Sequence, residues 1–257
     1  MKKCFPSAIF TPMRNLFCIF GFLSSALTLP AATILFDSAL PTGTNVLLSN
    51  PTVGTSGITI QNNTTLDRQA GFSFSLISTA SLSEVSVLVG SGWASTILGK
   101  QLTLEVVTLA SLASAPTYAT NPGTILLTNS TTLPSSTSFT TSDAFYLDFT
   151  LSAPLTLSAN QAYAVIFQFD PSSTNRTNGM SLRFSNTKGT SQVGYSFSSD
   201  NNGSTFTGQG SSSAMVFALS TSAIPEPSIA YLLITGSAAF GLVTYVRRKA
   251  VVSPKKN

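Results

Sequence analysis

Short alternation of apolar and polar residues runs through the middle of the chain. Every odd-numbered residue of 145–151 is apolar, and the large side chains of 163–169 again fall on odd positions. Successive side chains of a β-strand point to opposite faces, so this period of two predicts strands with one apolar and one polar face. The same alternation occurs at 72–76, 102–107 and 215–219. No part of this region carries the apolar stripe of an amphipathic helix.

Turn-forming residues separate these runs, at 50–51, 90–92, 121–123, 170–171 and 202–203. Many short strands with such punctuation predict an all-β fold, an antiparallel β-sandwich of jelly-roll type, over residues 33–222. Segment 130–142 is nearly all Ser and Thr and is expected to be a loop or a sheet edge. Twelve phenylalanines lie in this region, each worth about 1.5–3 kcal/mol when buried.

The predicted sandwich lacks the residues that many sites require. The whole chain has no histidine, and both cysteines, Cys4 and Cys18, precede the sandwich. Disulfides, Cys/His zinc sites and Ser-His-Asp or Cys-His nucleophiles are therefore excluded there. We expect no catalytic residue, no metal and no cofactor.

Residues 1–32 are typical of a signal peptide. Lys2, Lys3 and Arg14 precede and flank a short apolar run at 16–26, and small residues follow it. A retained anchor is the alternative, but the run is shorter than the ~20 residues that span a bilayer. A lipid-modified Cys18 is a weaker alternative, because bulky Phe17 stands before it.

An uncharged run at 228–246 is long enough to cross a bilayer as a helix. Arg247, Arg248 and Lys249 follow it, and such charges hold that side in the cytoplasm. We therefore expect residues 33–222 outside the cell and a cytoplasmic tail at 251–257. Residues 33–222 hold five basic and eight acidic residues, a net charge of −3, so the basic character of the chain belongs to its ends and predicts no nucleic-acid partner.

Pro225, Glu226 and Pro227 stand just before this run, and the two prolines favour extended backbone there. A Pro-Glu-Pro motif, one apolar span and a basic stop resemble the PEP-CTERM sorting domain, here 223–250. The resemblance implies recognition by an exosortase, a membrane processing enzyme, and delivery to the cell surface or an extracellular matrix. The additional tail after residue 249 departs from the usual pattern.

Three further stretches, 70–76, 155–169 and 195–208, resemble the choice-of-anchor β-sandwich domains that precede such tails. The resemblance covers most of 70–220. It implies a fold and a surface setting, and no activity.

Aromatic residues expected on loops are the candidates for contact with a glycan: Trp93, Tyr118 and Tyr195. The alternative for Trp93 is that it caps the core. Asp143 and Asp148 are the nearest carboxylate pair in sequence for a glycosidase. One position number is odd and the other even, so a single strand would point the two side chains to opposite faces. The loops at 170–175 and 200–204 resemble calcium loops faintly, and 202–203 is better interpreted as a hairpin turn.

The sequence thus predicts an exported, non-enzymatic surface or matrix protein that an exosortase sorts. It would be anchored transiently in the inner membrane of a Gram-negative-type bacterium through its C-terminal helix. The alternatives are a glycan-binding module of the cell surface or biofilm matrix, with extracellular polysaccharide as partner, and a polysaccharide-degrading enzyme.

Overall fold

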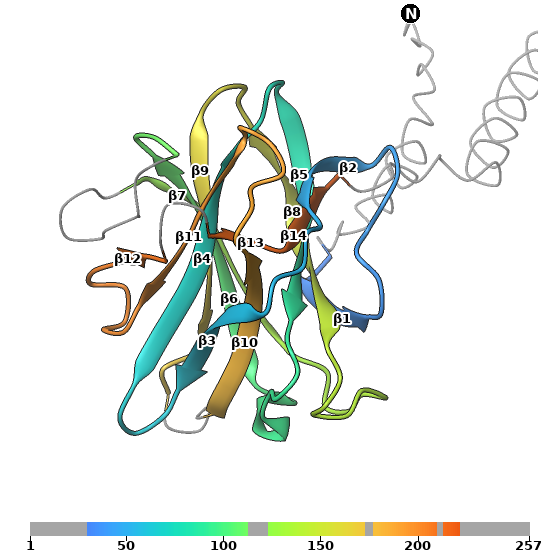
Figure 1. Cartoon of the computed structure of the whole chain (residues 1–257), viewed down its shortest axis with the longest axis vertical. Helices are drawn as coiled ribbons and strands as arrows, with labels where there is room; N and C mark the ends of the chain where they lie inside the picture. Colours follow the sequence, from blue (N-terminus) through green and yellow to red (C-terminus); the bar gives the residue numbers. More distant parts are fainter. Residues whose placement is uncertain (1–29, 113–122, 173–176, 210–212, 222–257) are drawn as a thin grey trace, which may run out of the picture. The chain divides into compact units, whose positions relative to one another are not determined.

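The computed structural model describes residues 30–112, 123–172, 177–209 and 213–221 (Figure 1). These residues form an all-β, antiparallel structure, and the only helical element among them is the short 3-10 helix η2 (Ser95–Ile97). The predicted fold class is confirmed at this level.

The strands follow one another along the chain without an intervening α-helix in the described ranges. They are β1 (Thr33–Asp37), β2 (Val46–Asn50), β3 (Ser56–Asn62), β4 (Asp67–Ser75), β5 (Ala80–Val89), β6 (Gln101–Leu109), β7 (Ile125–Thr132), β8 (Phe145–Leu157), β9 (Ala162–Phe169), β10 (Thr177–Ser185), β11 (Val193–Ser199), β12 (Thr207–Gly208), β13 (Ala214–Met215) and β14 (Phe217–Ser220).

The strands lie in two layers that the hairpin between β3 and β4 connects (Figure 1). Hydrogen-bonded neighbours follow the path β1-β8-β5-β10-β3-β4-β9-β6-β7. In the first layer β14 also pairs with β5 and β2, and in the second layer β11 pairs with β4 and β12.

The main core lies between the two layers. Phe72 of β4 stacks on Phe217 of β14 with 4.1 Å between ring centroids, which joins the layers at the centre. All twelve phenylalanines of the predicted sandwich belong to the main core or to a second apolar cluster, fully or partly buried. Burial of these rings stabilises the fold without a disulfide in this part of the chain.

The alternation in β8 has the predicted result. Phe145, Leu147, Phe149 and Leu151 are all buried in the main core. In β9 the prediction of one polar face is wrong, because Ala164 and Ile166 are buried as well. The second apolar cluster, which contains Phe197 and Phe206, packs on this outer face. The pattern of β9 could not show this, because the covering residues come from β11 and the loop after it.

The two ends of the strand path approach each other, so the antiparallel sheet is nearly closed. Strand β7 contacts both β1 and β8. The Asn129 side chain on β7 accepts a hydrogen bond from the Ser152 amide of β8 (3.0 Å) and donates one to the Ser152 hydroxyl (3.0 Å). We call this contact the seam. The Ser/Thr-rich segment begins in β7, which is a sheet edge as predicted, and continues as a loop.

No helix within the described ranges is long and apolar enough to cross a membrane. The predicted signal peptide, except for its last residues, and the whole predicted sorting region at 223–250, with the tail after it, lie outside the described residues.

Candidate functional site

The outer face of the first layer carries a row of polar side chains on neighbouring strands. Val85 and Val87 of β5 point into the main core, so Glu84 and Ser86 point to the opposite face. Cross-strand partners share a face, and Glu84 lies opposite Thr150 of β8 and opposite Ser220 of β14. Three strands therefore place a carboxyl group between two hydroxyl groups.

A cavity of about 270 Å³ opens beside this row. The loop before β2, the middle of β5, β8 and the end of β14 meet there. Its polar lining includes Thr42, Asn45, Ser83, Glu84, Thr150 and Ser220. Ser83 sits where the pairing of β5 with β8 shifts register, which is why it and Glu84 both reach the cavity.

Two of these hydroxyl groups are buried without a partner. Ser83 and Ser220 are 5% and 6% exposed, and neither hydroxyl oxygen has a hydrogen bond. A buried polar group without a partner costs about 1–3 kcal/mol. Both residues line the cavity, and their buried hydroxyl oxygens can meet a polar ligand there after a rotation of the serine side chain.

A second carboxyl group lies one register step away. Asp148 of β8 pairs with Ser86 of β5 and with Leu35 of β1, on the same outer face. It is only 8% exposed, and its Oδ1 atom has no hydrogen-bond partner. Asp37, two residues along β1 from Leu35, adds a third carboxyl group to this face.

The surroundings disfavour the charged form of two of these acids. Burial raises the pKa of Glu84, the Asp148 carboxyl adds to the rise, and the Thr150 hydroxyl partly offsets it. Burial also raises the pKa of Asp148. The Ser86 hydroxyl opposes that rise but does not reach hydrogen-bond geometry, and Asp37 adds to it. Both carboxyl groups therefore keep a proton more readily than an exposed acid.

The carboxylate pair considered in the sequence is not brought together. Asp143 lies in the exposed loop before β8, where its Oδ2 accepts hydrogen bonds from the Thr140 amide and hydroxyl (2.8 Å each). These bonds lower the pKa of Asp143, whereas the pKa of Asp148 is raised. The two acids thus occupy different environments, one in an exposed loop and one buried in a strand.

The glycan-contact candidates are placed as follows. Trp93 is 3% exposed, donates from Nε1 to the Thr140 carbonyl (3.2 Å) and meets the Phe145 ring edge-on. It caps the core, as the alternative held, and has no free face for a sugar. Tyr195 lies within strand β11 and not on a loop as expected, and the Lys188 ammonium, 3.2 Å from the centre of its half-buried ring, covers one face of it. Tyr118 lies outside the described residues.

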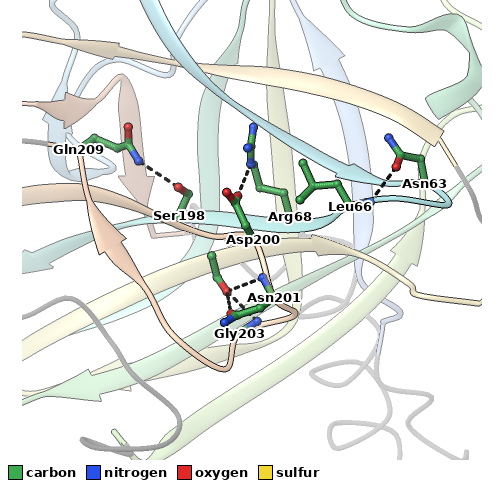
Figure 2. A network of polar contacts seen from close by, with 9 residues as sticks. Asn63, Leu66, Arg68, Ser198, Asp200, Asn201, Gly203 and Gln209 are labelled. Atoms are coloured by element: carbon green, nitrogen blue, oxygen red, sulfur yellow. Dashed lines mark hydrogen bonds and ion pairs between the residues drawn. The ribbon is translucent and has the colours of Figure 1, made fainter.

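The loop at 200–204 forms the predicted hairpin turn. Asn202 and Gly203 both have positive φ (54° and 77°), and the Ser204 amide donates to the Asn201 carbonyl (3.2 Å), as in the turns that connect β-hairpins. Figure 2 shows how the carboxylate of Asp200 is used: its Oδ1 accepts from Arg68 Nε at 2.5 Å. Among the described residues, no three acidic, cysteine or histidine side chains gather as a metal site would need.

Sequence reasoning missed Ser83, Glu84 and Ser220. One signal was present: Glu84 is a lone acid inside the otherwise apolar or small run 80–89. The cavity itself left no sequence signal, because its walls come from four segments that are well separated in sequence, at 41–46, 83–84, 150 and 220–221.

Comparison with known proteins adds no assignment. No family model matches the chain, and no curated protein matches it. The class that the fold and site define is therefore an all-β domain with a small cavity of mixed polar and apolar lining on one outer face.

Proposed function

We propose that the chain is an exported, non-enzymatic protein of the cell surface or extracellular matrix, sorted by an exosortase-type enzyme through its PEP-CTERM-like end. The supporting observation is the position of the motif relative to the fold. Strand β14 ends at Ser220, and Pro225 follows after four residues. A membrane-bound processing enzyme would thus meet the motif directly after a folded body.

The fold fits an extracellular setting. Its core consists of aliphatic and aromatic side chains from both layers, and no thiol is needed to hold it. We assign it to the jelly-roll-like sandwiches that the choice-of-anchor resemblance implies. The predicted signal peptide would start export, and the span at 228–246 would hold the chain in the inner membrane until processing.

The experiment compares the mass of the protein on the cell surface in a host with and without its exosortase. With the enzyme, we expect the surface form to lack everything after about residue 227. Without the enzyme, or with Glu226→Ala, the tail should remain. Asp143→Asn is the matched control, because it removes one exposed acid far from the motif in sequence. Full-length protein in the soluble cytosolic fraction, with both apolar ends intact, would contradict the proposal.

Glycan binding is the second candidate function, and the cavity on the outer face, with its mixed polar and apolar lining, supports it. The described aromatic candidates do not support it, since Trp93 is buried and Tyr195 lies in strand β11 with one ring face covered. Polysaccharide cleavage is a weaker candidate, because Asp143 and Asp148 lie apart in unlike environments.

A further inference from the structure

The cavity between the loop before β2 and strands β5, β8 and β14 has the chemistry of a ligand site. It combines buried hydroxyl groups that lack partners, one carboxyl group and the amide side chain of Asn45. Pro41 and Val46 add an apolar part to the same lining. Small-molecule sites typically combine an apolar wall with a few convergent polar groups in this way.

The size of the cavity limits what can enter. Pockets for drug-sized ligands measure about 300–1,000 Å³. At about 270 Å³ the cavity lies just below that range, so it suits one ring of a small molecule and not an extended oligomer.

The charge of the lining limits the ligand further. No basic side chain is among the described residues that line the cavity, so an anion would find no counter-charge. Calcium takes six to eight oxygen ligands and usually several carboxylates, whereas Glu84 is the one acid among these lining residues. A neutral ligand with several hydroxyl groups can satisfy Ser83, Ser220 and Glu84 together, because hydroxyl groups both donate and accept.

We propose that this cavity binds a single neutral sugar unit. Glu84 would hold two neighbouring hydroxyl groups of the sugar, and Val46 would contact the ring. Ser83 and Ser220 would rotate their now buried hydroxyl groups into the cavity and bond to further hydroxyl groups of the sugar. This site does not depend on sorting, so it can be present or absent whatever the outcome of the mass experiment.

The test is a titration of the full-length chain, in a detergent without a sugar headgroup, followed by ligand-observed NMR. The probes are glucose, galactose, mannose and N-acetylglucosamine, each tested alone. We expect at least one of them to bind saturably. Glu84→Leu should weaken its binding about tenfold or more, and Ser220→Ala should weaken it several-fold, as for loss of one hydrogen bond. Glu84→Gln, which keeps hydrogen-bonding groups, should bind better than Glu84→Leu.

Two matched controls separate loss of the site from damage to the fold. Ser196→Ala removes another buried hydroxyl without a partner, on β11, and Asp143→Asn removes an acid from the distant loop. Both should bind the sugar like the unmodified chain. The proposal is overturned if none of the four sugars binds, if all variants bind alike, or if the cavity variants lose only the binding of added Ca²⁺.

Discussion

At the scale of single residues, Asp148 occupies a position that does not favour its charge. It is buried, and one of its carboxyl oxygens has no hydrogen-bond partner. The carboxyl group of Asp37 raises the pKa of Asp148, and Asp148 in turn raises the pKa of Glu84. A raised pKa in the folded state means that folding takes up a proton between the unfolded and folded pKa values. The stabilising contribution is therefore complete at low pH and is lost as the pH rises through the folded pKa.

Replacement of Asp148 by asparagine tests this argument. We expect Asp148→Asn to raise the free energy of unfolding at pH 7 by about 1 kcal/mol, in line with the cost of a buried unsatisfied group, and to gain less near pH 4. Urea unfolding at the two pH values measures the difference. Asp143→Asn is the control. The pKa of Asp143 is lowered in the folded state, so its charged carboxylate stabilises the fold above the unfolded pKa, and this stabilisation is lost as the pH falls. Equal effects of Asp148→Asn at both pH values would contradict the argument.

At the scale of elements, Gly71 lets three strands of the second layer pack closely. It lies within β4, between β9 and β11. A Cβ atom at this position would lie 2.1 Å from the Val165 carbonyl oxygen and 2.8 Å from the Phe197 ring. Both are closer than real Cβ contacts, and the carbonyl belongs to the backbone and cannot turn aside.

We therefore expect Gly71→Ala to destabilise the fold by about 1–3 kcal/mol, as overpacking of a core does. Chemical unfolding monitored by fluorescence would measure this. Gly208→Ala in β12 is the matched control, since no atom lies within 4 Å of the added methyl group. A Gly71→Ala variant as stable as Gly208→Ala would show that β4 and its neighbours shift apart at little cost.

The elements also show what the sequence could predict. The alternation at 145–151 predicted the buried face of β8, and Asn202-Gly203 predicted a hairpin turn, because both signals are local. The second buried face of β9 and the cavity around Glu84 depend on residues distant in sequence. Trp93 was ambiguous for the same reason, since only the fold brings Thr140 and Phe145 to it.

At the scale of the whole molecule, the described fold depends on apolar packing. Both cysteines of the chain fall in the predicted signal peptide. In a small secreted domain that relies on a native disulfide, removal of that bond costs about 2–5 kcal/mol of stability, so a reductant would reveal one. We expect the thermal unfolding temperature to be the same with and without dithiothreitol, measured by circular dichroism on the full chain. A lower unfolding temperature in the reductant would show that a thiol bond contributes to the fold.

The seam has a consequence for molecules held at high local density. A strand at an open end of a sheet offers free amide and carbonyl groups to any similar strand nearby, which is how stacked aggregates start. Here the Asn129 side chain links the last strand of the path to Ser152 of β8, in the first layer of the same molecule. Neighbouring copies crowded side by side would therefore find less backbone to pair with at this place, and each could stay a separate particle.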